Sequence, residues 1–273
     1  MDATPAKMRK TYIDARHGQM HVRYAGQHHG ERRPLLCFHL SPVSGVIYET
    51  WLTEMGRDRL TIAPDTPGYG MSDYTLTPPG IKDFAQAMGD VMDSYNIKEA
   101  DVMGYHTGSK IAVELARQRP ARIKHLVLMS APVYTEEDLK KQRASNSIPE
   151  ADAEGKFLVA AWTSLLRWQD KRASLKDTLK HFPDHLRGGD KRGWGHQAAF
   201  AYTYPDTIVD VSAPILVFNP EDDLVEYTPR IKPYLKNGRV KDLPGWSHQL
   251  LDFSAKEMAA MVRPFLDEDK FPA

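Results

Sequence analysis

The sequence predicts an α/β fold, in which a mostly parallel sheet of eight strands carries helices on both faces and an inserted helical cap. Two observations lead to this prediction. Short apolar runs alternate with segments whose apolar residues recur at helical spacing, which is typical of strand–helix–strand units. The alternation stops between residues 133 and 210 and then resumes. We therefore predict a core of residues 1–132 and 211–273 and a cap of residues 133–210.

The expected strands are of two kinds. Residues 11–24 alternate weakly in polarity around His17-Gly18, which favours a hairpin of two edge strands. Most of the other strands are expected to be buried on both faces, because their sequences are short apolar runs. The expected buried runs are Pro34–Leu40, Leu60–Ala63, Val102–Met103, Ile123–Met129 and Pro214–Phe218, with a last strand at Arg239–Leu243.

Helices are expected between these strands. In Ile81–Tyr95 the apolar positions fall on one face of a helix, which predicts that this face packs on the sheet. The other expected helices are Val46–Met55, Ile111–Ala116, Phe157–Trp168, Thr228–Lys236 and Ala255–Leu266.

The composition favours a small-molecule partner. Lys and Arg together number 36, as do Asp and Glu, so net charge gives no reason to expect nucleic acid or an anionic membrane. The single cysteine, Cys37, lies in an apolar run and is expected to be a buried hydrophobe in a reducing compartment. No apolar run approaches the ~20 residues that span a membrane. We therefore expect a cytoplasmic monomer or homodimer.

One stretch organises the chain. A strand, a turn with two glycines and a helix follow one another at Ala100–Ala116. Gly104 and Gly108 permit a turn so sharp that the middle side chain stands exposed above the sheet, as in a nucleophile elbow. The middle residue of such elbows is usually Ser, and here it is His106.

Polar residues also follow three other strands. They lie at 39–44, 219–223 and 246–248. Because open parallel sheets place their chemistry at the carboxyl ends of strands, we expect these loops to meet His106 at one edge of the sheet.

Four motifs resemble those of one family. In chain order, Phe38–Pro42 resembles a His-Gly-x-Pro loop, Pro64–Asp73 an Asp-x-Pro-Gly-x-Gly-x-Ser loop, Pro214–Asp223 a strand followed by a catalytic acid, and Pro244–His248 a loop with a catalytic His. Together they resemble the α/β-hydrolase superfamily, in its cap-bearing branch of esterases, dehalogenases and C–C hydrolases. The chain departs from the pattern at Leu40, which replaces a Gly, and at His106.

The resemblance implies roles for four residues. Asp223 would orient His248 and stabilise its imidazolium, which leaves the other ring nitrogen of His248 as a general base. Asp222, one position away, is the rival acid. The backbone N–H groups of Ser41 and Thr107 would form an oxyanion hole, which is typically worth about 3–4 kcal/mol per donor.

His106 has four competing interpretations. It is a nucleophile that forms an acyl-imidazole, or it is an acid/base partner while the His248–Asp223 dyad activates water or substrate directly. The second interpretation, which we prefer, suits hydrolysis and also lyase chemistry. In the third, His39, His106, His248 and Asp223 bind a metal, although no local ligand spacing supports this. In the fourth, the chain is a catalytically dead binding module.

The cap is rich in aromatic residues that would roof a pocket. The predicted substrate-binding residues are Leu40, Tyr105, Trp162, Trp168, Trp194 and Tyr202. We expect His181, His185 and His196 to be solvated, and Asp65 to brace its own loop.

The favoured function is cofactor-independent hydrolysis of a small, partly apolar ester, thioester, lactone or activated C–C bond, with no metal. His106, His248 and Asp223 are the predicted catalytic residues. The alternatives are a non-hydrolytic lyase or isomerase that uses the same dyad, and a small-molecule binder without activity.

Overall fold

The computed structural model describes residues 6–28, 32–145 and 150–273. Its centre is one eight-stranded sheet with the order β1-β2-β4-β3-β5-β6-β7-β8. The strands are β1 (Arg9–Ala15), β2 (Gly18–Ala25), β3 (Leu35–Phe38), β4 (Thr61–Pro64), β5 (Ala100–Tyr105), β6 (Ile123–Met129), β7 (Ile215–Pro220) and β8 (Gly238–Leu243). Strand β2 pairs antiparallel with β1 and β4, and every other pairing is parallel. The predicted fold class is confirmed.

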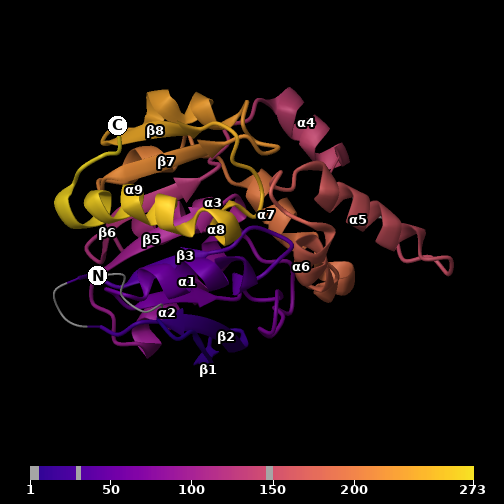
Figure 1. Cartoon of the computed structure of the whole chain (residues 1–273), viewed down its shortest axis with the longest axis horizontal. Coiled ribbons are helices and arrows are strands. Elements are labelled where there is room, and N and C mark those ends of the chain that lie inside the picture. Colours follow the sequence, from indigo (N-terminus) through magenta and orange to yellow (C-terminus); the bar gives the residue numbers. More distant parts are fainter. Residues whose placement is uncertain (1–5, 29–31, 146–149) are drawn as a thin grey trace.

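The helices occupy both faces of this sheet and its right-hand side in Figure 1. They are α1 (Glu49–Met55), α2 (Ile81–Ser94), α3 (Thr107–Gln118), α4 (Glu136–Ser145), α5 (Lys156–Arg167), α6 (Leu175–Arg187), α7 (Trp194–Ala201), α8 (Leu250–Phe253) and α9 (Ala255–Glu268). The described residues also form 3₁₀ helices at Gly45–Tyr48, Gly189–Lys191, Ile208–Asp210 and Thr228–Tyr234.

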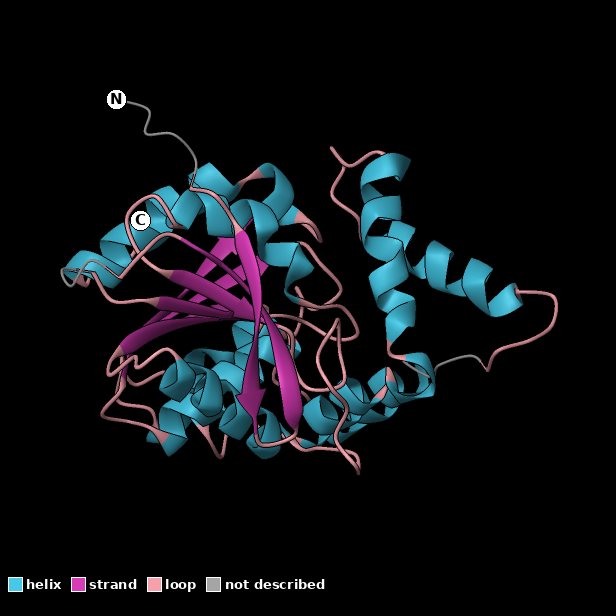
Figure 2. Ribbon diagram, turned by 90° about the horizontal axis from the view of Figure 1, so that it is seen from below, coloured by secondary structure: helices cyan, strands magenta, loops and turns pink. Residues whose placement is uncertain are grey.

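Successive residues of a strand point to opposite faces, and the core is divided accordingly. Val102 of β5 packs in the cluster that contains α2 and α3, whereas Met103 packs in the cluster that contains α1 and α9. Figure 2 shows the sheet between these two helical layers. Cys37 is fully buried in the second cluster, as expected, and burial raises the pKa of its thiol.

Two predicted helices differ from the observed ones. Val46–Met55 is a 3₁₀ turn followed by α1, and Thr228–Lys236 is a 3₁₀ helix that ends at Tyr234. Pro229 and Pro233 both lie in the latter segment. Because proline donates no backbone hydrogen bond and clashes with the preceding turn, an α-helix is disfavoured there.

The segment that we predicted to be a cap, residues 133–210, lies between β6 and β7 and contains α4 to α7. In Figure 1 it occupies the side of the sheet opposite the marked C-terminus. Helix α7 packs on α2 and α3, whereas α5 and α6 pack on each other. No residue of α5 is buried.

The order of the strands fixes where a site can form. After β4 the chain crosses to β5 on the far side of β3, so the direction of winding reverses at β3. The loops that leave β3 and β5 therefore flank a crevice at the carboxyl edge of the sheet, where α/β proteins bind ligands.

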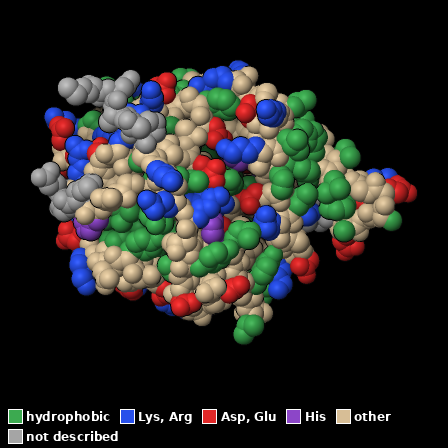
Figure 3. Space-filling view, turned by 60° about the horizontal axis from the view of Figure 1, so that its bottom comes forward, with side chains coloured by type: hydrophobic (Ala, Val, Ile, Leu, Met, Phe, Trp, Pro, Cys, Tyr) green, Lys and Arg blue, Asp and Glu red, His purple; other side chains and the backbone are tan. Residues whose placement is uncertain are grey.

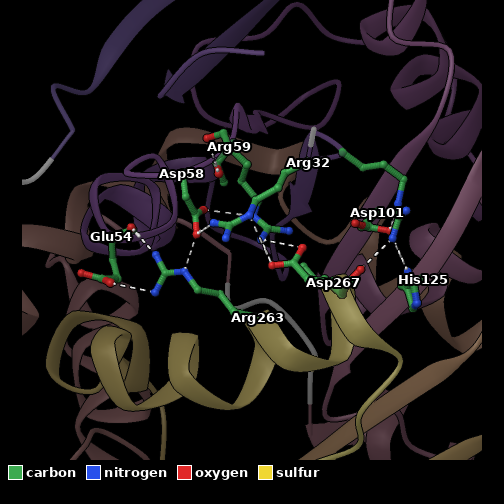
Figure 4. A network of polar contacts seen from close by, with 11 residues as sticks. Arg32, Glu54, Asp58, Arg59, Asp101, His125, Arg263 and Asp267 are labelled. Carbon is green, nitrogen blue, oxygen red and sulfur yellow. Dashed lines mark hydrogen bonds and ion pairs between the residues drawn. The ribbon is translucent and has the colours of Figure 1, made fainter. Parts of the chain in front are cut away.

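Ion pairs connect α9 to the chain near the opposite end of the parallel strands, where β4 begins. Arg263 of α9 contacts Glu54 and Asp58 at 3.0 and 2.8 Å, and the buried Arg59 contacts Asp267 at 2.7 Å (Figure 4). These contacts tie the last helix to the end of α1. Elsewhere on the surface, charged side chains of both signs are interspersed, as Figure 3 shows for one face.

Candidate active site

The turn between β5 and α3 holds its middle residue in a strained conformation. His106 has φ 49° and ψ −110°, outside the regions that side chains favour. The two glycines serve close packing, because a Cβ on Gly108 would lie 1.9 Å from the Phe38 carbonyl oxygen, and one on Gly104 would lie 2.2 Å from that of Gly108. The backbone strain therefore sits on His106 itself, as in a nucleophile elbow.

His248 and Asp223 form an imidazole–carboxylate pair. The loop after β8 brings His248 Nε2 to 2.8 Å from Asp223 Oδ1, on the loop after β7. Burial alone would lower the pKa of His248, but the hydrogen bond and charge of Asp223 raise it above its ordinary value. Burial alone would also raise the pKa of Asp223, yet His106 and His248 hold it well below its usual range.

His106 forms a second pair of the same kind. Its Nε2 lies 2.9 Å from Asp222 Oδ2 and 3.9 Å from Asp223 Oδ1. Asp222 is fully buried, and its carboxylate also accepts hydrogen bonds from the Ser130 hydroxyl at 2.5 Å and the Leu224 amide at 2.8 Å. Asp222 and Asp223 are thus not alternatives for one role, because each faces a different histidine.

Tyr105 packs behind both imidazoles instead of facing the cavity. Its ring lies edge-on to His106, with centroids 4.7 Å apart, and is stacked on His248 at 5.9 Å. It is buried in the cluster on the α1 and α9 face of the sheet. It is not among the residues that line the cavity described below, so the structure does not support its predicted contact with substrate.

The loop after β3 is braced from inside. The buried His39 accepts a hydrogen bond from the Thr66 amide at its Nε2 and contacts the Leu40 carbonyl oxygen through Nδ1, both at 2.8 Å. Burial lowers the pKa of His39. Asp65, fully buried, accepts the amide of Gly45 at 2.9 Å. Both side chains fix the loop that carries Ser41.

A cavity of about 410 Å³ opens beside these groups. Leu40, Ser41, His106, Asp223 and His248 line it from the core together with neighbouring residues of their loops, and residues of the segment between β6 and β7 line the rest. The lining residues from that segment include Ala160, Ala161, Ser164, Leu165, Trp168, Gln169 and Thr178. A side chamber of about 40 Å³ adjoins the main cavity and shares His106, His196 and Asp223 with it; Thr107 lines only the side chamber.

Of the six predicted substrate-binding residues, Leu40 and Trp168 line the main cavity. The predictions for Trp162, Trp194 and Tyr202 are not supported by the structure. Trp162 lies in a separate apolar groove, Trp194 packs beside the Lys191 ammonium, and the Tyr202 hydroxyl donates to Glu114. Which side of these helices faces the cavity depends on how they pack, and the spacing of residues in the sequence does not reveal that packing.

Three histidines expected to be solvated line the cavity instead. Burial lowers the pKa of His185 to about 3 and that of His196 to about 4. His181 Nε2 lies 2.9 Å from Asp252 on α8. A sequence signal existed for two of them, because His181 and His185 are four residues apart and therefore share one face of α6.

The inserted segment also pairs with the loop of His248. The His248 amide donates to the Trp168 carbonyl at 3.1 Å, and the Asp170 amide donates to the His248 carbonyl at 2.9 Å. These two hydrogen bonds therefore fix the backbone of His248 to the segment between β6 and β7.

A metal ion has one candidate position in the described part of the chain. One ligand atom from each of His106, Asp222, Asp223 and His248 lies within 4.8 Å of the others. Two imidazoles and two carboxylates suit zinc or iron. However, each imidazole already lies at hydrogen-bond distance from a carboxylate, and His39 of the predicted metal set uses both ring nitrogens elsewhere.

A sharp elbow at the carboxyl edge of a sheet with this strand order is the arrangement of α/β hydrolases. The sequence agrees: the model of the alpha/beta hydrolase fold family matches residues 33–178, more than half of the chain. The chain belongs to this family. Among the described helices, none is both long and apolar enough to cross a membrane.

Individual relatives cover shorter segments. The chain is 33% identical over 103 residues to the 2-hydroxymuconate semialdehyde hydrolase of Pseudomonas sp. (strain CF600), covering 36% of each protein. It is 28% identical over 109 residues to the 2-hydroxy-6-oxo-2,4-heptadienoate hydrolase of Pseudomonas putida, covering 37% of the chain and 38% of the relative. These matches span little more than a third of either relative.

Several solved structures match nearly the whole fold, among them an enol-lactonase. The enol-lactonase from Burkholderia xenovorans LB400 superposes with a TM-score of 0.77 and 17% sequence identity, covering 94% of this chain and all of that one. At this identity the likeness shows the fold alone.

Proposed function

We propose that the chain is a cofactor-independent hydrolase of a small, partly apolar molecule with an ester, thioester, lactone or activated C–C bond. One observation carries the proposal: the His248–Asp223 pair, 2.8 Å apart, lies in the wall of a 410 Å³ cavity beside the elbow residue His106. An oriented imidazole at a pocket wall is what general-base catalysis requires.

His248 is the base in this proposal. A carboxylate only accepts hydrogen bonds, so the Nε2 that faces Asp223 carries the proton and Nδ1 holds the lone pair. Nδ1 then takes a proton from water or substrate, and Asp223 stabilises the imidazolium that forms. Trp168 and Asp170 support this role by fixing the backbone of His248.

His106 acts opposite this base. Its ring lies 5.1 Å from that of His248, and Asp222 holds its Nε2 at 2.9 Å. We favour a path in which His248 activates water directly and His106 binds or protonates the substrate. In the alternative path, His106 attacks the carbonyl carbon through Nδ1, the bond to the alcohol, thiol or carbon leaving group breaks, and the leaving group takes up the proton that the His106 ring gives up. Water activated by His248 then hydrolyses the acyl-imidazole and restores His106.

The Ser41 and Thr107 amides are proposed as the oxyanion hole. They follow β3 and the elbow, on neighbouring strands, and Thr107 begins a helix whose first N–H groups have no intrahelical partner. Negative charge on a carbonyl oxygen would be stabilised there.

The relatives support carbonyl chemistry. The two curated ones are named as hydrolases of a semialdehyde and of an oxo acid, and the solved one as an enol-lactonase. A second candidate function, a lyase or isomerase, is favoured by the two facing imidazole–carboxylate pairs, since one can donate a proton while the other accepts one.

Turnover of short-chain p-nitrophenyl esters tests the proposal. His248→Ala should abolish turnover. The control variant is His28→Ala, which replaces an exposed histidine far in sequence from the loop of His248 and should leave turnover unchanged. Unchanged activity in His248→Ala would contradict the assignment of the base. Saturable binding of esters without turnover would indicate a binding module, and release of product without uptake of water from ¹⁸O-water would indicate the lyase.

A further inference from the structure

A buried lysine stands behind the elbow and has no role in the proposed hydrolysis. Lys110 lies one turn into α3, four residues after His106, and is 4% exposed. A lysine is almost never buried to this degree unless its charge is paired. Burial lowers the pKa of Lys110 to about 7.

The ammonium is surrounded by aromatic rings instead of carboxylates. Its Nζ lies 4.8 Å from the ring centroid of Tyr204 and 5.9 Å from those of Tyr134 and Tyr202. Among the described residues its one hydrogen bond is to the Tyr202 carbonyl oxygen, at 2.6 Å. An ammonium has three donors, so two of them are left for a ligand.

The nearest acid on the same helix is used elsewhere. Glu114, one turn further along, accepts hydrogen bonds from Arg117 at 2.7 Å and from the Tyr202 hydroxyl at 3.0 Å. Asp223, the one carboxylate among the described residues that line the chamber beside Lys110, is paired with His248. The positive charge of Lys110 is therefore not balanced by a carboxylate of its own.

Lys110 lines the side chamber of about 40 Å³. One water molecule needs about 10–15 Å³ of such volume, so the chamber fits a group of roughly three heavy atoms. Thr107, at the positive end of the α3 dipole, lines the same chamber. His106 lines both the side chamber and the main cavity.

We propose that the side chamber is a carboxylate-binding subsite, in which Lys110 and the start of α3 hold an acidic group beside the reacting centre. The inference rests on the proposed function for its link to substrate: the preferred substrates then carry a carboxylate a few atoms from the bond that is cleaved. The subsite itself is a property of the chamber and is tested separately.

Binding of acetate to the full chain tests the subsite without turnover. Acetate should bind saturably in an NMR or calorimetric titration at constant ionic strength, and acetamide, its neutral isostere, should not. Lys110→Met should weaken acetate binding at least tenfold, while Lys82→Met, an exposed lysine on α2, should leave it unchanged. Circular dichroism checks that both variants fold, and Lys110→Gln serves as a second variant.

A matched pair of esters distinguishes substrate carboxylate from free carboxylate. Mono-p-nitrophenyl adipate and p-nitrophenyl hexanoate have chains of equal length, and Lys110→Met should lower kcat/KM for the acid by about tenfold or more relative to the neutral ester. An acetate effect without this preference assigns the subsite to a free carboxylate. If neither ester turns over while acetate still binds through Lys110, the hydrolase proposal fails and the subsite stands. Acetate binding that is absent, or equal in wild type and Lys110→Met, overturns the subsite.

Discussion

The Asp223→Asn variant keeps the shape of the acid and removes the charge that faces His248. With Nε2 and Oδ1 2.8 Å apart, an imidazolium and a carboxylate have charge centres about 4 Å apart and attract by about 4 kcal/mol at an effective dielectric of about 20. This attraction arises only when His248 takes up a proton in the transition state. Its loss corresponds to a decrease of roughly a thousandfold in kcat.

The same variant should change the pH dependence. Asp223 raises the pKa of His248 against the opposing effect of burial. Because the base works in its unprotonated form, wild-type activity falls as the pH drops through this raised pKa. Without the carboxylate the pKa falls, so the acid limb of kcat/KM should move to lower pH. Both parameters are measured with p-nitrophenyl acetate from about pH 5 to 9.

Asp222→Asn is the matched control, because it changes the adjacent carboxylate, which faces His106 at 2.9 Å. It should reduce kcat less and leave the acid limb near its wild-type position. Thermal melting of both variants confirms that each is folded. The reverse result, a thousandfold loss with a shifted limb in Asp222→Asn and a mild effect in Asp223→Asn, would refute His248 as the base.

Three further predictions concern the same region. Intact-mass analysis during ester turnover should show no acyl adduct on His106, and a stable adduct that disappears in His106→Ala would establish the covalent path instead. Lys110→Met should stabilise the fold by up to roughly 5 kcal/mol at neutral and lower pH, since a pKa near 7 means the unfolded chain binds more protons between about pH 7 and 10. This advantage should shrink as the pH rises through that window, and a pH-independent difference in urea unfolding would contradict it. Chelators should not reduce activity, whereas added Zn²⁺ should inhibit by occupying the His106, Asp222, Asp223 and His248 cluster; loss of activity on chelation would contradict a metal-free mechanism.

The parts of the site that the sequence predicted are those set by strand ends. His248 and Asp223 follow neighbouring parallel strands, β8 and β7, and such ends meet at one edge of a sheet. The alternation of side chains along β5 also indicates that Tyr105 is buried, which our prediction for this residue did not take into account. Tyr105 lies two residues after Met103, so both side chains point to the same buried face.

The parts that were missed depend on packing between segments distant in the sequence. Trp162 lies in the middle of α5 and Trp168 directly follows the helix, and of these two only Trp168 lines the cavity. Which face of α5 turns inward depends on α6 and on the loop of His248, and neither is encoded in the spacing of α5. The pairing of His106 with Asp222 was missed for a different reason. The family motif provides for one acid and one imidazole, so it gives no partner for a second imidazole.

That pairing explains how a histidine can occupy the elbow. If the imidazole at the elbow were not paired with Asp222, no carboxylate would orient its ring. The Asp222 carboxylate would then keep the hydrogen bonds from Ser130 and Leu224 among those described. Instead, two consecutive acids on the loop after β7 each face one imidazole, and the rings lie 5.1 Å apart at the cavity wall. One imidazole can therefore hold a proton while its neighbour accepts one, each with a counter-charge in place. We infer that the exchange of serine for histidine replaces a nucleophile by an acid/base partner, so that His106→Ser should lower activity and not convert the site into a serine hydrolase.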